Sequence, residues 1–284
     1  MVKRPVWKPE VPWYFFTGGL AGASSVLALA ARVSGDRALA ASARRAAAAG
    51  ALVSPVLLVA DLGVPSRFLN MLRVFRPTSP LNLGSWLLCA YVPSAVGAAA
   101  LGERAGWPVL GTLADLAAAA GGLGIATYPA VLVADTATPV WHEARRELPF
   151  VFASAAAATA GAAALATAPA PSRPTARRMV VAATVVELAA VSVMDRHLGP
   201  LAHPYHEGRS GRFHKAARVS AVSGAVLAAA AGHRRAPAVA AAALVMAGAL
   251  CERWAVFTAG WQSAARPEDT IGPQRSRAGA GHGA

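Results

Sequence analysis

The chain has 284 residues, of which 55% are hydrophobic and only 14% are charged. Average soluble domains carry roughly 25% charged residues, so this composition excludes an ordinary soluble domain and indicates an integral membrane protein. The net charge of +13 does not indicate a nucleic-acid partner, because the 27 Lys and Arg residues fall between apolar segments and do not cluster with aromatic residues.

Eight apolar stretches follow one another along the chain. Stretches of roughly 18 or more apolar residues are typical of transmembrane helices, and the segments between them carry the Arg, Pro, Gly and acidic residues that mark helix ends and turns. We predict helices at 13–31, 46–64, 82–101, 110–134, 149–168, 178–194, 216–232 and 237–259. The sequence therefore predicts an all-α integral membrane protein with about eight transmembrane helices.

We expect residues 1–265 to form one transmembrane domain and residues 266–284 to be a disordered tail rich in Gly, Arg and Pro. Two four-helix bundles are the expected arrangement, although the proline-rich linker at 169–174 follows the fifth predicted helix and not the fourth. The polar first residues are followed by no small-residue cleavage site, so no removable signal peptide is predicted. Gly18 and Gly22 form a small-xxx-small pair, which predicts close packing of the first helix.

An even number of helices places both chain termini on the same side of the membrane. With these boundaries, 17 of the 27 Lys and Arg residues fall on the terminal side and 10 on the other side. Because positive residues favour the cytoplasmic side, the count predicts a protein of the cell membrane with cytoplasmic termini.

Several ionisable residues lie inside or at the ends of the apolar stretches. Asp61 and Asp135 each end an apolar run, Glu187 lies in the middle of one, and Glu252 and Arg253 lie near the end of the eighth. A carboxylate buried in a membrane is costly unless it is paired or protonated, so such positions usually have a function. For Asp61 and Asp135 the alternative is an interfacial residue that reaches water or pairs with a loop arginine. Glu252 and Arg253 are sequence neighbours that share no helix face, so each needs another partner.

The histidine and cysteine positions argue against metal centres in this chain. A membrane haem needs histidines that project into the bundle from facing helices. The predicted boundaries instead place every histidine in a loop, at a helix end or in the tail: His142, His197, His203, His206, His214, His233 and His282. Iron–sulfur clusters generally need four thiolates, and the chain has only Cys89 and Cys251. We therefore expect no haem, no iron–sulfur cluster and no metal site.

One specific motif begins at the end of the second predicted helix. It reads Asp61-Leu62-Gly63-Val64-Pro65-Ser66-Arg67-Phe68 and continues to Ser79-Pro80 and Gly84-Ser85-Trp86. This segment strongly resembles the NrfD/PsrC family, the membrane subunits of polysulfide-reductase-type complexes. Three weaker similarities fall in the same order along the chain, from Pro12 to Gly22, from Tyr128 to Pro149 and from Arg253 to Gly260.

The resemblance implies an eight-helix subunit without haem that exchanges electrons with menaquinone or ubiquinone. It also implies a ferredoxin-like iron–sulfur subunit with four clusters as a partner, connecting the chain to a molybdopterin subunit with molybdenum or tungsten. Such complexes include formate dehydrogenases and polysulfide reductases. By itself the chain would be non-catalytic, or it would be the quinone-reactive subunit of the oxidoreductase.

In the family the quinone head group lies between the start of the first helix and the end of the fourth. Carboxylate, imidazole and phenol groups beside a dry pocket can supply hydrogen bonds and protons. The resemblance therefore predicts a quinone site made of Tyr14, Thr17, Asp61, Arg67, Asp135 and His142. It leaves Glu187 and Arg253 for a proton pathway.

Each of these assignments has a structural alternative. Tyr14 can belong to an interfacial aromatic belt, and Arg67 can set topology or contact a partner. Glu187 and Arg253 can form structural ion pairs. Two other functions also stay open: a transporter or proton-translocating protein without redox function, and a passive anchor for a soluble oxidoreductase.

Overall fold

The computed structural model describes residues 5–64, 66–102, 107–266 and 268–269. Within these ranges every regular element is a helix. Eight are long: α1 (Glu10–Val33), α2 (Arg37–Asp61), α4 (Pro80–Leu101), α5 (Pro108–Ala134), α7 (Leu148–Thr167), α8 (Arg173–Leu198), α10 (Gly208–Ala230) and α11 (Arg235–Ala265). Short helices connect them: α3 (Arg67–Met71), α6 (Pro139–Glu143), η1 (Ala144–Arg146), η2 (Ala170–Ser172), η3 (Gly199–Ala202) and α9 (His203–His206).

The long helices coincide with the eight predicted stretches, but α2 and α10 begin eight or nine residues earlier than predicted. The charged first turns of both helices look like loop in a hydropathy profile. In α2 the start is fixed by Asp36, whose side chain accepts a hydrogen bond of 2.9 Å from the backbone N–H of Leu39. Charged residues in the first turns therefore belong to the helices, so the predicted boundaries at 46 and 216 were wrong.

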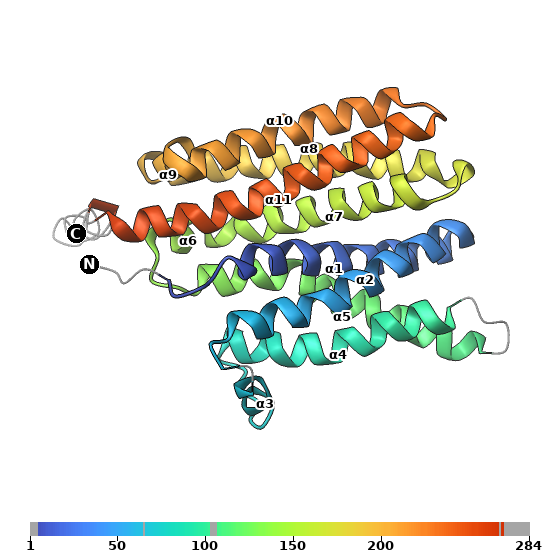
Figure 1. The fold of residues 1–284 in the computed structure, drawn as a ribbon, viewed down its shortest axis with the longest axis horizontal. Coiled ribbons are helices and arrows are strands. Elements are labelled where there is room, and N and C mark those ends of the chain that lie inside the picture. Colours follow the sequence, from blue (N-terminus) through green and yellow to red (C-terminus); the bar gives the residue numbers. More distant parts are fainter. Residues whose placement is uncertain (1–4, 65, 103–106, 267, 270–284) are drawn as a thin grey trace, which may run out of the picture.

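Two four-helix bundles stand side by side (Figure 1). Helices α1, α2, α4 and α5 pack together as the first bundle, and α7, α8, α10 and α11 form the second. Helix α7 lies at the boundary, against α1 and α5. The predicted pair of bundles is confirmed. The chain passes from one to the other through residues 135–147, and not through the proline-rich linker.

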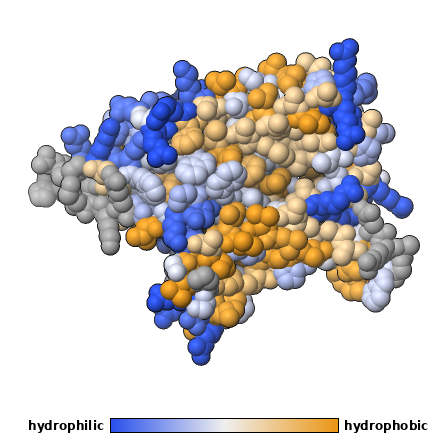
Figure 2. Space-filling model, viewed as in Figure 1, coloured by the Kyte–Doolittle hydropathy of each residue, from blue (hydrophilic) through white to orange (hydrophobic). Residues whose placement is uncertain are grey.

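Six of the long helices are long and apolar enough to cross a membrane: α1, α2, α4, α5, α7 and α11. Figure 2 shows an apolar band across the middle of the molecule with hydrophilic residues toward both ends. The arrangement is that of a multi-pass membrane protein. Helices α8 and α10 fall short of the same measure among the described residues, so eight crossings stays a prediction.

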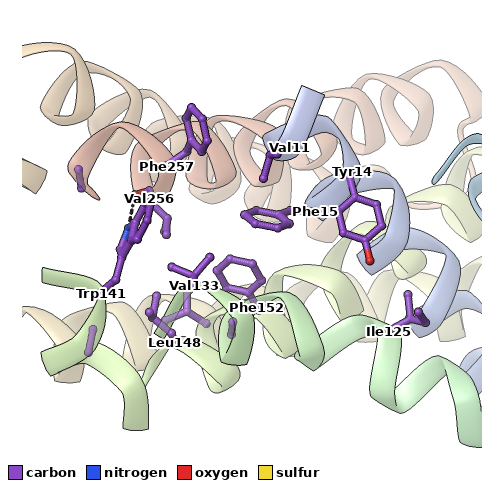
Figure 3. Close-up of a cluster of buried hydrophobic side chains, with 14 of the residues drawn as sticks. Val11, Tyr14, Phe15, Ile125, Val133, Trp141, Leu148, Phe152, Val256 and Phe257 are labelled. Atoms are coloured by element: carbon purple, nitrogen blue, oxygen red, sulfur yellow. Dashed lines mark hydrogen bonds between the residues drawn. The ribbon is translucent and has the colours of Figure 1, made fainter. Parts of the chain in front are cut away.

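The start of α1 and the end of α11 lie at the same end of the molecule, here called the terminal end (Figure 1). An aromatic core lies toward this end, where the two bundles meet (Figure 3). The fully buried Trp141 of α6 donates a hydrogen bond of 2.8 Å from Nε1 to the carbonyl of Val256 in α11, and its ring stacks on Trp7. These contacts fix α6 against the second bundle.

The backbones of α1 and α5 touch at Gly22 and Gly122, because a Cβ atom on Gly22 would lie only 2.3 Å from the carbonyl oxygen of Gly122. This contact confirms the predicted close packing of the first helix.

We expect Gly22→Ala to destabilise the protein by about 1–3 kcal/mol, because the added methyl group forces α1 and α5 apart. Gly97→Ala in α4 is the matched control, since its Cβ would lie 3.9 Å from the nearest atom, and it should be neutral or slightly stabilising. Thermal unfolding in detergent measures both variants. Equal melting temperatures for the two would contradict the close contact.

Candidate functional site

Four hydroxyl side chains of the first bundle lie toward the terminal end, and we call them the hydroxyl cluster: the buried Tyr14 and Ser54 and the partly buried Thr17 and Tyr128. The Thr17 and Ser54 hydroxyl oxygens are 3.0 Å apart and share a hydrogen bond between α1 and α2. Ser54 also hydrogen-bonds to the carbonyl of Gly50 at 2.7 Å. The pair thus joins two helices through side chains that could also serve a ligand.

The two tyrosines of the cluster differ in their bonding. The Tyr128 hydroxyl donates to the carbonyl of Pro80 at 2.6 Å, and its ring lies against Gly84, where a Cβ atom would be 2.2 Å from the ring. Tyr14 is only 2% exposed, yet its hydroxyl makes no hydrogen bond within the described residues. Figure 3 shows this hydroxyl pointing from α1 toward the helix that carries Ile125, which is α5. It is close enough to Tyr128 for electrostatic interaction.

The other four predicted site residues lie at the surface of the terminal end. Asp61 is half-buried at the end of α2 and accepts a hydrogen bond of 2.8 Å from the backbone N–H of Lys8. Arg67 and Asp135 are exposed, and exposed His142 places Nδ1 3.3 Å from the carbonyl of Ala134. No hydrogen bond or ion pair within the described ranges joins these four to the hydroxyl cluster. The structure therefore places Tyr14 and Thr17 in one cluster and places the other four predicted site residues at the surface of the terminal end.

An apolar cavity of about 240 Å³ lies between α2, α3 and α4. It is lined by Pro55, Phe68, Leu88, Cys89, Val92 and Pro93. Pro55 directly follows Ser54, and Leu88 lies one helical turn beyond Gly84, so the cavity borders the helices that carry and contact the hydroxyl cluster. Phe68 belongs to the sequence motif that begins at the end of the second helix. The motif therefore contributes to the wall of this cavity.

A second polar cluster is buried inside the second bundle. Arg253 of α11 is 1% exposed, donates from Nη2 to the carbonyl of Phe152 at 3.0 Å, and lies 4.0 Å above the Phe152 ring. Glu187 of α8 is buried within electrostatic range of Glu252 and Arg253. Glu252 in turn faces His214 of α10, with Oε2 3.5 Å from Nδ1. As predicted, the neighbours Glu252 and Arg253 have different partners.

His214 was predicted to lie in a loop or at a helix end, but the structure buries it in the second turn of α10. It is the seventh residue of α10 and is 3% exposed. Its Nε2 atom lies 3.9 Å from Oδ2 of Asp195, and its ring centre lies 5.7 Å from the ring centre of Tyr205. The cause is the charged start of α10, which extends the helix back beyond 216. Among the described residues His214 is the one buried histidine, which gives no facing pair for a haem, and the absence of haem stays an expectation.

A third polar cluster went unnoticed in the sequence. Asp115 of α5 is 1% exposed and accepts hydrogen bonds from Arg44 Nε at 2.8 Å and Nη2 at 2.6 Å, and from Arg32 Nη1 at 2.9 Å. Asp115 lies inside the apolar stretch predicted as a helix at 110–134. Its charge within that stretch was the signal that could have indicated a buried polar cluster. The cluster lies at the end of the first bundle opposite the termini.

The loops of the terminal end carry a surface network. Arg266 Nη2 lies 2.9 Å from Glu207, and this hydrogen bond and its charge lower the pKa of the Glu207 carboxyl. His203 lies 2.8 Å from Asp269, which is buried. These contacts include the first residues of the predicted disordered tail. Most of the rest of the tail, 270–284, lies outside the described residues.

Comparison with known proteins gives one family match. The model of the family described as "Polysulphide reductase, NrfD" matches residues 1–203, which include the whole first bundle and helices α7 and α8. No curated protein matches the chain.

Proposed function

Since the chain belongs to the NrfD polysulphide reductase family, we propose that it is the quinone-reactive membrane subunit of a molybdenum or tungsten oxidoreductase complex. The family consists of membrane subunits of molybdoenzyme complexes. In the proposed complex an iron–sulfur partner exchanges electrons with menaquinone or ubiquinone through this chain. The molybdopterin subunit carries the substrate chemistry.

One observation carries the proposal: Tyr14, which is 2% exposed, lies in a group of hydroxyl side chains that α1, α2 and α5 bring together. No hydrogen bond within the described residues engages the Tyr14 hydroxyl, so it is available to a ligand or to water. Hydroxyl donors suit the carbonyl oxygens of a quinone, and Thr17 with Ser54 lies one turn deeper on the same side of α1. The residues present therefore fit a quinone head group.

A bound quinone would supply two-electron, two-proton chemistry. Tyr14 and Thr17 would hold the carbonyl oxygens, and the buried position would exclude bulk water. The surface carboxylates and imidazole of Asp61, Asp135 and His142 would exchange protons with the aqueous phase, and Arg67 would contact the partner or a lipid head group. The apolar cavity lined by Phe68 and Leu88 would take the first part of the isoprenoid tail.

The assembled complex tests this function and separates it from the passive anchor. Membranes that contain the complex should reduce a menaquinone analogue when supplied with the substrate of the molybdopterin subunit. A complex that oxidises its substrate with an artificial dye, and never with quinone, would show that the chain only anchors its partners.

We also propose that Glu187 and Arg253 belong to a proton pathway in the second bundle. The support is a buried run of ionisable side chains, from Glu187 through Glu252 and His214 to Asp195 near the terminal end. Several of their polar atoms have no hydrogen-bond partner among the described residues, including both ring nitrogens of His214 and Nε of Arg253. Water is the expected bridge between such groups.

We expect Glu187→Gln to slow proton uptake coupled to quinone reduction by about tenfold or more, since the amide cannot carry the proton. Proteoliposomes with an internal pH dye measure the rate. Thr184→Val, one turn earlier on α8 and buried, is the control and should leave proton uptake unchanged. Normal proton uptake in the Glu187→Gln variant would show that the glutamate is structural and does not carry the proton.

A further inference from the structure

Four basic residues follow one another along α10, and we call them the basic strip: Arg209, Arg212, Lys215 and Arg218. Each step of three residues turns by about 60° around the helix, so Arg212 and Lys215 lie on its outward face and Arg209 and Arg218 lie at opposite edges of that face. They recur every third residue and all are exposed. No side chain of the strip forms an ion pair or a hydrogen bond within the described part of the chain. Arg218 is within electrostatic range of Asp195 and His214 but forms no ion pair with either.

The strip reaches deep along the helix. Arg218 is ten residues beyond Gly208, which places it about 15 Å from the start of α10. The whole helix has 23 residues, or about 35 Å, and the hydrocarbon core of a bilayer is about 30 Å thick. If α10 crosses the membrane as predicted, Arg209 and Arg212 can extend to the membrane surface, whereas Arg218 lies near mid-depth.

Contact with lipid is therefore unfavourable for the outward face of α10. A lysine or arginine at mid-membrane depth is costly, and such residues almost always face protein or water-filled space. Beyond the strip the same helix exposes Val219, Val222 and Val226, so its far half is not a water-facing surface either. Figure 2 shows hydrophilic residues over the α9 end of α10 and apolar ones farther along. A partner protein can contact both the basic half and the apolar half of this face.

The other faces of α10 already have partners. Gly224 lies against Val245, and Gly248 of α11 lies against Ala221, so the inward face packs closely on α11. Helix α8 contacts another side. The outward face is the one left for a partner.

A second copy of this chain does not fit that face. The strip needs carboxylates at matching depth, and among the described residues the acids within the apolar band, Asp115, Glu187 and Glu252, are buried and engaged inside their own bundles. The exposed acids lie at helix ends or in loops. A copy would bring apolar surface or further arginines against the strip.

We propose that the outward face of α10 docks a second, different membrane-embedded protein whose helix carries carboxylates opposite Arg212, Lys215 and Arg218. Opposite charges at matching depth would neutralise the strip and fix the register, while an apolar face of the partner would cover Val219, Val222 and Val226. Helix α10 lies beyond residues 1–203 that match the family model, and this inference does not depend on quinone binding.

The test uses the full chain in its native membranes. A photo-reactive phenylalanine analogue replaces Val222, which is 43% exposed, and irradiation is followed by alkaline carbonate extraction. We expect crosslinking to one distinct polypeptide that stays in the membrane fraction. The triple variant Arg212→Glu, Lys215→Glu, Arg218→Glu should reduce the crosslink by about tenfold or more, since like charges face each other.

A matched control carries three reversals at the opposite end of the molecule: Arg178→Glu, Arg234→Glu and Arg235→Glu, all at exposed positions. It should keep the crosslink. If the triple variant fails to accumulate, the milder pair Lys215→Gln and Arg218→Gln replaces it. Changing the carboxylates of the identified partner to lysine should restore the crosslink to the reversed chain.

Three results would overturn the proposal. One is a crosslinked product of two copies of this chain. Another is a partner that is released by carbonate. The third is a crosslink whose yield is unchanged by reversal of the strip, which would include crosslinking to lipid alone.

Discussion

Replacing Asp115 with alanine is expected to destabilise the protein by about 3–5 kcal/mol, because two arginines then lose the carboxylate that neutralises them inside the first bundle. Arg44 is 5% exposed and binds Asp115 through two nitrogens, and Arg32 adds a third contact at 2.9 Å. An unpaired guanidinium in this position has neither water nor a counterion. The loss should appear as a large fall in the melting temperature in detergent.

The double variant Arg44→Leu with Asp115→Leu provides the control for this prediction. It removes the buried pair together, and replacing a buried ion pair by apolar residues is often nearly neutral. We therefore expect most of the stability to return, with Arg32 reaching solvent from its partly exposed position. A single Asp115→Ala variant that melts like the unsubstituted protein would show that the cluster contributes nothing to folding.

Removing the Tyr14 hydroxyl should weaken the interaction with quinone. Tyr14→Phe deletes one hydrogen-bond donor, worth up to about 1.5 kcal/mol, so KM for quinone should rise by about tenfold with little change in stability. Adding Thr17→Ala removes the second hydroxyl and should bring the increase to about a hundredfold. Steady-state reduction of a menaquinone analogue by the assembled complex measures both values.

Tyr91→Phe is the matched control. Tyr91 is also buried in the first bundle, but its hydroxyl hydrogen-bonds to Ser25 at 2.9 Å, deeper in the bundle than the hydroxyl cluster. Its loss should leave KM for quinone unchanged. If Tyr14→Phe and Tyr91→Phe raise KM equally, a general loss of packing explains the effect and the assignment of Tyr14 is wrong.

The sequence predicted the number, order and approximate positions of the long helices, because long apolar stretches admit few alternatives in a membrane. It failed at charged helix starts. Arg44, Arg45, His214 and Lys215 were excluded from helices by their charge, although burial against other helices gives two of them partners. Hydropathy along one segment cannot show that a charge faces inward.

The candidate site was predictable only in part for a related reason. Tyr14 and Thr17 were identified because a motif placed them at the start of the first helix. Ser54 and Tyr128 became site residues only when the fold brought α2 and α5 against α1. Asp61 and Asp135 are both at the terminal end as expected, yet their distance from the hydroxyl cluster depends on where each helix ends. Contacts between distant segments set these positions.

Photoaffinity labelling with an azido-quinone tests the central claim most directly. The assembled complex is irradiated with the probe, and the labelled peptides are mapped by mass spectrometry with and without excess menaquinone. We expect competed labelling on the α1 peptide that contains Tyr14 and Thr17 and on the α5 peptide that contains Tyr128. Competed labelling confined to the second bundle, or labelling that menaquinone does not displace, would contradict a quinone site in the hydroxyl cluster.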